Sequence, residues 1–381
     1  MNNTIKLGNF ISEYSIRNRA GDDIPVYSVT NKEGFCRDYF SKDVASQDRS
    51  TYKIVPRGCF AYNPSRINVG SVDWQRKEDR VIVSPLYVVF SVSKGLDQQY
   101  LYYYLKSEKC LYYIKELASG SVRDNLKLSM LKEFTIPNIT LEEQRKAVMV
   151  LEQTDRLIVL QERQMTVLDE LVKSRFVEMF GEPVTNSKGY PIHQLSDHIL
   201  FLTSGSRGWA QYYTDKGEWF ITIKNVKDCR ISVDDVQCIN PPKNAEAERT
   251  RLREGDLLIS ITADLGRTGV VTKEIAEHGA YNNQHLTCIR LDRLALDPLY
   301  VAFFMESEAG KRQFEAKNMS AVKAGLNFDS IRSLRLIVPP LALQKEFDTF
   351  VAEVDKSKLA VKQSLEKLET LKKSLMQQYF G

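Results

Sequence analysis

Two segments of the chain carry hydrophobic residues at alternating spacings of four and three positions. They begin at Leu141 and Leu341, and neither contains a glycine or proline for nearly 40 residues, which favours uninterrupted helix. The seam positions of the second segment are Phe347, Val351, Val354, Lys358, Val361, Leu365, Leu368, Lys372, Leu375 and Tyr379. Those of the first segment are Ala147, Leu151, Thr154, Ile158, Gln161, Met165, Leu168, Val172, Arg175 and Met179. Most positions in both sets are apolar, and a 3.5-residue repeat is typical of a coiled coil.

The two helices are expected to pair with each other in an antiparallel coiled coil. Each would be about 55 Å long at ~1.5 Å per residue, more than one turn of B-DNA at about 34 Å. Such a pair would act as a spacer that holds two globular domains apart. The alternative is two amphipathic helices that each pack on their own domain. Pairing is favoured because the two seams coincide in position along the repeat.

The second half of the chain can be laid on the first at an offset of 200, without a gap from about residue 100 onward. Repeats of this kind indicate a duplicated architecture. The clearest correspondences are Leu141 and Gln144 with Leu341 and Gln344, Lys173-Ser174 with Lys373-Ser374, and Phe180-Gly181 with Phe380-Gly381. Upstream the match loosens, around Gly58 and Gly255. The halves therefore diverge in the region before each helix, where different specificities are expected to reside.

The regions before each helix alternate short β-rich runs with turn residues. In the first half, residues 54–58, 62–64 and 81–92 are strand-like and residues 100–117 are helical. In the second half, residues 219–226, 256–262 and 286–291 are strand-like. The expected fold is α+β, with two similar globular domains, two long helices and a pseudo-twofold internal repeat. The boundaries are 1–140 and 182–340 for the domains, and 141–181 and 341–381 for the helices.

Composition narrows the class of protein only mildly. With 381 residues the chain is long enough for two cores, and its 43% hydrophobic and 27% charged content is ordinary for a globular protein. The longest apolar run, residues 81–92, is shorter than the ~20 residues of a membrane span. The start of the chain lacks a signal-peptide pattern, so a cytoplasmic location without a membrane partner is expected. Six scattered cysteines give no zinc-site spacing, and disulfides are not expected in a reducing compartment.

Several local motifs resemble the specificity subunits of type I restriction-modification systems. They are residues 136–144 and 338–344 ahead of the long helices, residues 174–181 at the end of the first, and residues 260–269 followed by Asn282-Asn283-Gln284-His285. The resemblance covers essentially the whole chain, and the order and duplication of the motifs carry it. The first copy departs from the family's proline-rich pattern at Asn138 and Thr140.

The resemblance implies a non-catalytic subunit that binds double-stranded DNA. Its two globular parts would be target-recognition domains, one for each part of a split target. The partners implied are two methyltransferase subunits and, for cleavage, motor-nuclease subunits. No cofactor is expected in this chain, whereas S-adenosylmethionine, ATP and Mg are expected on those partners.

The sequence lacks the motifs of the enzymes that would act in such a system. An adenine methyltransferase needs a [DN]-P-P-[YF] motif, and Asn240-Pro241-Pro242-Lys243 has lysine where the aromatic residue belongs. No phosphate-binding G-x-x-x-x-G-K-[ST] loop occurs. The four histidines form no metal-ligand motif and are expected to be structural.

Arg, Lys, Asn and similar residues near turns are candidate DNA contacts, because such side chains bind phosphates or base edges. In the first domain they are Arg17, Asn18, Arg19, Asn63, Arg66, Arg123 and Lys127. In the second they are Ser206, Arg207, Trp209, Lys224, Asn225, Thr262, Arg267, Asn282, Asn283 and Lys323. Arg207 and Arg267 rank first because each lies beside glycines, where backbone can approach DNA closely.

Three other functions are compatible with the sequence. The chain could be the recognition module of a methyltransferase-only or other defence assembly. It could be a catalytic methyltransferase, which retention of S-adenosylmethionine would reveal. It could also be a coiled-coil scaffold that never meets DNA, in which case no footprint over two separated half-sites would form.

Overall fold

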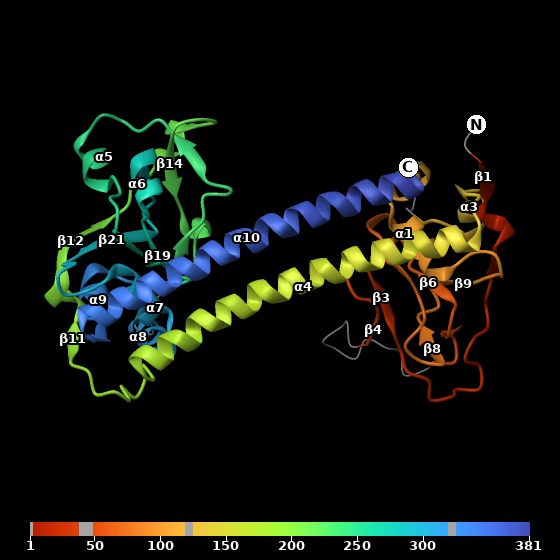
Figure 1. Cartoon of the computed structure of the whole chain (residues 1–381), viewed down its shortest axis with the longest axis horizontal. Coiled ribbons are helices and arrows are strands. Elements are labelled where there is room, and N and C mark those ends of the chain that lie inside the picture. Colours follow the sequence, from red (N-terminus) through yellow and green to blue (C-terminus); the bar gives the residue numbers. More distant parts are fainter. Residues whose placement is uncertain (1–2, 38–48, 119–124, 319–324) are drawn as a thin grey trace. The chain divides into compact units, whose positions relative to one another are not determined.

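The structure is a computed structural model, and it describes residues 3–37, 49–118, 125–318 and 325–381. The chain packs as two compact units (Figure 1). Unit 1 consists of Met1–Arg163 and Val361–Gly381, and unit 2 consists of Gln164–Ala360. The long helices α4 (Leu141–Phe180) and α10 (Leu341–Phe380) each contribute to both units. The boundaries predicted from the sequence treat each long helix as a separate segment, whereas the two compact units each include parts of both helices. The predicted boundaries stay predictions.

Each unit contains a four-stranded antiparallel sheet of the same topology. In unit 1 the spatial order is β2 (Ile11–Glu13), β9 (Val88–Val92), β6 (Phe60–Tyr62) and β7 (Val72–Trp74). In unit 2 it is β12 (Ile199–Ser204), β21 (Leu286–Leu291), β18 (Leu257–Ser260) and β19 (Thr268–Val270). Since the strands follow the chain in the same way, the predicted duplication and α+β fold class are confirmed.

The elements beside each sheet also correspond. Unit 1 pairs β1 (Thr4–Lys6) with β10 (Thr135–Pro137), and has helices α1 (Gln98–Lys106), α2 (Glu108–Ala118) and α3 (Leu128–Lys132). Unit 2 pairs β11 (Ile192–Gln194) with β22 (Arg335–Ile337), and has α7 (Pro298–Glu306), α8 (Glu308–Asn318) and α9 (Phe328–Arg332).

The remaining elements differ between the units. Unit 1 adds the strand pairs β3 (Ser28–Thr30) with β4 (Gly34–Cys36) and β5 (Lys53–Pro56) with β8 (Arg80–Val83). Unit 2 adds a second sheet of β13 (Tyr213–Thr214), β17 (Gln237–Ile239), β14 (Glu218–Ile221) and β20 (Ala280–Asn282). It also adds the pair β15 (Val226–Lys227) and β16 (Arg230–Ile231), and helices α5 (Ala245–Thr250) and α6 (Lys273–His278). Short 3-10 turns are η1 (Leu7–Asn9), η2 (Ile67–Val69), η3 (Leu195–His198), η4 (Trp209–Tyr212) and η5 (Ile223–Asn225).

Three predicted elements are interrupted in the structure. The helix predicted at 100–117 is two helices, because Ser107 adopts an extended backbone (φ −69°, ψ 148°) between them. The strand-like run 81–92 is two strands, with a turn at Pro85 where the backbone has no N–H to donate. The run 219–226 leaves its strand after Ile221 and forms a 3-10 turn.

A buried glutamine joins each long helix to the N-terminal cap of an earlier helix in the same unit. Gln144 accepts a hydrogen bond from the backbone N–H of Asp97 (2.8 Å) and donates to two backbone carbonyls. Gln344 accepts from the N–H of Asp297 at the same 2.8 Å and also donates to two carbonyls. Both aspartates cap a helix, α1 and α7, through their side chains. The offset of 200 therefore persists down to individual hydrogen bonds.

The predicted seams are the protected faces of the long helices. Every one of their twenty side chains is buried or half-buried, whereas hydrophobic residues off the seam, such as Leu157, Leu160 and Val167, are about half exposed (47%, 58% and 50%). In unit 2, Asp169 pairs with Lys358, and Arg175 Nη2 lies 3.0 Å from Glu346 Oε1. Since the partner number falls as the first number rises, α4 and α10 run antiparallel, as the sequence predicts for a coiled coil.

The core of each unit combines the start of one long helix with the end of the other. In unit 1, Leu151 of α4 and Phe380 of α10 lie in one cluster, and the Phe380 ring is 4.9 Å from that of Tyr100. In unit 2, Phe347 of α10 and Phe180 of α4 lie in one cluster, and the Phe180 ring is 4.7 Å from that of Tyr300. Both helices are thus part of both hydrophobic cores. No helix in the described part of the chain is long and apolar enough to cross a membrane.

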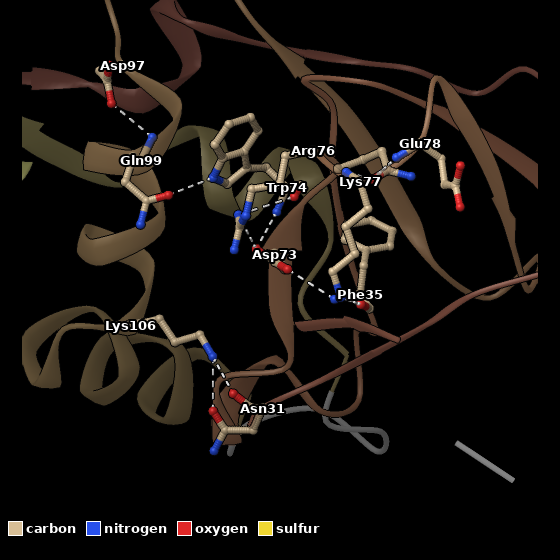
Figure 2. A network of polar contacts seen from close by, with 11 residues as sticks. Asn31, Phe35, Asp73, Trp74, Arg76, Lys77, Glu78, Asp97, Gln99 and Lys106 are labelled. Carbon is tan, nitrogen blue, oxygen red and sulfur yellow. Dashed lines mark hydrogen bonds and ion pairs between the residues drawn. The ribbon is translucent and has the colours of Figure 1, made fainter. Parts of the chain in front are cut away.

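A buried carboxylate organises the side of the unit 1 sheet around β7 (Figure 2). Asp73 accepts hydrogen bonds from the backbone N–H groups of Phe35 (3.0 Å) and Trp74 (2.8 Å) and from the guanidinium of Arg76 (3.0 Å). The indole of Trp74 donates to Gln99 of α1 at 3.0 Å. Because Asp73 is almost fully buried, these donors compensate its lost hydration, and they join β4, β7 and α1.

Candidate nucleic-acid interface

At one end of each four-stranded sheet the strands lead into loops whose residues differ between the units. In unit 1 this end lies where β6 ends at Tyr62, which pairs with Val88 at the start of β9. In unit 2 it lies where β18 ends at Ser260, which pairs with Leu286 at the start of β21. We refer to these as the loop edge of unit 1 and the loop edge of unit 2. Most of the candidate DNA contacts in the described residues map to them.

The loop edge of unit 1 contains a groove of about 920 Å³. Its lining residues are Glu13, Asn63, Pro64, Ser65, Leu86, Val88, Asn125, Leu126, Lys127, Leu128 and Ser129. Two candidates chosen from sequence, Asn63 and Lys127, therefore line one surface, although they are far apart in the chain. A third, Arg66, is exposed in the same β6–β7 loop.

The candidates at residues 17–19 divide into exposed and buried side chains. Arg17 and Arg19 are exposed, and Arg17 forms an isolated backbone bridge with Lys53. Asn18 is only 2% exposed, and its amide donates to the carbonyl of Asp22 at 2.9 Å. The two arginines can meet a ligand, whereas in this conformation Asn18 holds the bend that presents them.

The loop edge of unit 2 is shaped by the hairpin between β18 and β19. Thr262 Oγ1 shares a hydrogen bond of 2.7 Å with His285 Nδ1. The guanidinium of Arg267 forms an ion pair with Asp264 three residues earlier, and its backbone N–H donates to Ser260 Oγ at 2.9 Å. Thr262 and Arg267 are half-buried, so each still presents part of its surface to solvent.

A second group of candidates lies across the same edge. Arg207 is exposed and makes no hydrogen bond or ion pair with any described residue. Its neighbour Ser206 is fully buried and shares a hydrogen bond of 2.9 Å with Thr250. Asn282 is also fully buried and donates to the Leu286 carbonyl at 2.8 Å, whereas Asn283 is half-buried. Ser206 and Asn282 therefore support the loops in this conformation, as does Asn283 by accepting from the backbone N–H of His285 at 3.2 Å, whereas Arg207 faces solvent.

Three candidates of unit 2 lie in the turns η4 and η5. Trp209 is 3% exposed and its indole donates to Glu246 at 3.2 Å. Asn225 is 6% exposed and accepts from the backbone N–H and the hydroxyl of Thr222. Lys224 is exposed. Neither enclosure is predictable from local sequence, because Trp209 is covered by the second sheet of unit 2 and Asn225 bonds its own turn and the carbonyl of Ser232.

Two further candidates, Arg123 and Lys323, lie outside the described residues. Two residues at the edges were absent from the candidates, namely Glu13 and Leu86. Glu13 ends strand β2, and the side chain of Leu86 is 77% exposed in the turn before β9. A search for cationic and amide residues would not find either one, and only the register of β2 on β9 places Glu13 beside Asn63 and Lys127.

The backbone of the unit 1 edge is supported by a lysine within the fold. Lys53 Nζ donates to the carbonyl of Tyr87 at 2.6 Å, next to Leu86. Burial lowers the pKa of Lys53, although Coulombic attraction to Glu13 acts in the opposite direction. This contact fixes the turn from which Leu86 projects.

The described residues offer hydrogen-bonding groups rather than metal ligands or disulfides. Within the described residues, no three His, Cys, Asp or Glu side chains gather in a way that could hold a metal ion. All six cysteines are free thiols. The chemistry that the edges offer is hydrogen bonding by arginine, lysine, amide and carboxylate groups.

The fold and the two edges define a class of protein: a pair of homologous modules that present different loops on one scaffold, with two antiparallel helices shared between them. A family model for the type I restriction modification DNA specificity domain matches residues 6–170 and 235–371, well over half of the chain. The chain therefore belongs to the type I restriction-modification specificity family.

One relative with a similar sequence agrees with this assignment. The type I restriction enzyme MjaIX specificity subunit of Methanocaldococcus jannaschii is 32% identical over 151 residues, which are 35% of this chain and 34% of that protein. The alignment thus spans about a third of that relative's length.

Two solved structures share the fold over nearly the whole chain. One, from work on complex assembly and conformational transition of the type I R-M system, has a TM-score of 0.61 at 16% identity and covers 99% of this chain and 97% of its own. The type I restriction-modification S subunit from M. genitalium has a TM-score of 0.56 at 13% identity, with 99% and 96% covered.

Proposed function

We propose that this chain binds double-stranded DNA at a bipartite sequence, with one half-site read by the loop edge of each unit. The observation that carries the proposal is that the same sheet presents different side chains at the same edge in the two units. Unit 1 offers Asn63 and Lys127 there, and unit 2 offers Thr262 and Arg267. A duplicated scaffold with divergent edges suits the reading of two unlike sequences.

The exposed arginines have the chemistry for both parts of DNA recognition. Arg17, Arg19, Arg66 and Arg207 can bind phosphates, which positions a protein on the duplex without selecting a sequence. Amide and guanidinium groups at the loop edges can also contact the bases in the major groove. There each base pair presents a distinct pattern of hydrogen-bond donors and acceptors. Of the two first-ranked candidates, Arg207 is free to do so, whereas Arg267 must share its guanidinium with Asp264.

The chain would act as the non-catalytic recognition subunit of a larger enzyme. We propose that two methyltransferase subunits bind it, with motor-nuclease subunits added for cleavage, and that S-adenosylmethionine, ATP and Mg are held by those partners. The second candidate is a methyltransferase-only or other defence assembly, which a neighbouring motor gene would argue against.

Methylome sequencing of cells that carry this gene with its partner genes tests the proposal. The expected result is methylated adenine in a motif of two short sequences separated by a fixed spacer. A single continuous motif, or no motif that depends on this gene, would contradict it.

The long helices are proposed to set the spacer. Insertion of one helical turn into both α4 and α10, at equivalent positions in the repeat, lengthens each by about 5.4 Å. The methylated motif should then show a longer spacer with both half-sites unchanged. An unchanged spacer would defeat the proposal for the helices while leaving DNA recognition intact.

A further inference from the structure

The groove at the loop edge of unit 1 combines a carboxylate, an ammonium, an amide and an apolar side chain, each of which has atoms available to a ligand. Glu13 and Lys127 are exposed and form no hydrogen bond or ion pair through their side chains with any described residue. The carbonyl oxygen of the Asn63 side chain accepts from the backbone N–H (3.1 Å) and hydroxyl (2.9 Å) of Ser65. This fixes the orientation of the side chain and leaves its NH₂ group available. Leu86 adds an apolar surface that is 77% exposed.

Glu13 is the unexpected member of this set. An ionised carboxylate has only acceptor atoms, and DNA phosphates repel it. Lys53 attracts Glu13 through its charge but donates its hydrogen bond to the carbonyl of Tyr87, so Glu13 would weaken DNA binding unless it meets a hydrogen-bond donor on the DNA. In the major groove the donors are the exocyclic amino groups of cytosine and adenine. A carboxylate at this place therefore has a limited set of favourable partners.

The equivalent position in unit 2 shows that the sheet does not require a carboxylate. Glu13 lies opposite Phe90, which pairs with Phe60 two residues after Gly58. In unit 2, Leu202 lies opposite Ile289, which pairs with Leu257 two residues after Gly255. The two glycines correspond, with φ of +87° and +82°. Leu202 thus occupies the position of Glu13, and the carboxylate belongs to unit 1 alone.

We propose that Glu13 determines the base at one position of the half-site read by unit 1, by accepting a hydrogen bond from an exocyclic amino group in the major groove. Lys127 and the Asn63 amide supply donors to acceptors on the neighbouring base or phosphate. Leu86 forms an apolar wall against which the base edge packs. This inference rests on the proposed function, since it assumes that the loop edge of unit 1 meets DNA.

The experiment uses the full chain assembled with its methyltransferase subunits and a panel of duplexes that carry each base at every position of the methylated motif. Dissociation constants are measured for the wild type, Glu13→Gln, Glu13→Ala and the control Glu133→Gln. Glu133, between α3 and β10, is an exposed carboxylate paired with Lys6 of β1, and an exposed ion pair of this kind contributes little to stability. Thermal melting of each variant verifies that it is folded, and Glu13→Gln keeps the shape of the side chain.

The wild type is expected to prefer an amino-bearing base at one position of the unit 1 half-site by roughly 5- to 100-fold. Glu13→Ala should remove that preference and leave all other positions unchanged, and the control should behave as wild type. Whether cytosine or adenine is preferred identifies the amino group. Tighter binding of Glu13→Gln to every duplex would overturn the inference and place Glu13 against a phosphate, and an unchanged preference would also overturn it. If the wild type reads no bipartite sequence, it is the proposed function that fails.

Discussion

The buried glutamine at the start of each long helix gives a sharp test of how the recognition units are held together. In unit 2, Gln344 is fully buried and bonds the N–H of Asp297 (2.8 Å) and the carbonyls of Pro339 (2.8 Å) and Ala295 (3.3 Å). Gln344→Leu keeps much of the side-chain volume but removes all three hydrogen bonds. The cap of α7 and the first turn of α10 would then lose their connection.

The expected loss of stability follows from these three backbone groups. A buried polar group left without a partner costs about 1–3 kcal/mol, and partial relaxation keeps the costs from adding fully. We expect Gln344→Leu to lower the free energy of unfolding by about 3–5 kcal/mol, a large part of the roughly 5–15 kcal/mol of a native domain. Gln144→Leu should cost unit 1 a similar amount, because its hydrogen bonds are equivalent.

Urea unfolding can follow each unit separately through tryptophan fluorescence. Trp74 lies in unit 1, and the other two tryptophans, Trp209 and Trp219, lie in unit 2. A Trp74→Phe background therefore reports on unit 2 alone. Gln153→Leu, on an exposed face of α4, serves as the control and should stay within about 0.5 kcal/mol of wild type. A loss below about 1 kcal/mol for Gln344→Leu would show that the glutamine is not the main connection between the cap of α7 and the start of α10.

Two further predictions concern charge. His193 and His198 share a hydrogen bond of 2.9 Å, and burial, followed by the charge of His193, lowers the pKa of His198. The unfolded chain therefore binds a proton more readily, so unit 2 should lose stability as the pH falls below about 6.5. Thermal melting at a series of pH values checks this, and a His198→Gln variant that kept the same pH dependence would contradict it. Arg267→Ala should weaken DNA binding by about 1–3 kcal/mol and relax one base position of the unit 2 half-site, as measured on the duplex panel. Equal weakening on all sequences would assign Arg267 to a phosphate.

Much of the architecture could be predicted from the pattern of residues alone. The seam positions predicted after Leu141 and Leu341 are all buried or half-buried in the structure. In a long helix without glycine or proline, the hydrophobic repeat alone decides which face is buried. The offset of 200 holds for Gln144 and Gln344, whose hydrogen bonds each reach a helix cap 47 residues earlier. Such features depend on strict periodicity or on the repetition of the same plan along the chain.

The residues of the candidate interface could be predicted only in part from the sequence. Arg207 and Lys127 are exposed as a surface contact requires, but Asn18, Ser206 and Asn282 have the same polar character and are buried. Composition cannot distinguish them, because a polar residue in a loop can either face solvent or bond the backbone of that loop.

The duplicated α+β plan and the two antiparallel helices could be predicted from the sequence, since periodicity and repeats are properties of the chain order, and local motifs carried the resemblance to the family. Which side chains meet at the loop edges depends on how the chain folds. Glu13, Asn63 and Lys127 are brought to one groove by the pairing of β2 and β6 with β9 and by the segment before α3. Long-range strand register sets that proximity, and no local pattern in the chain encodes it.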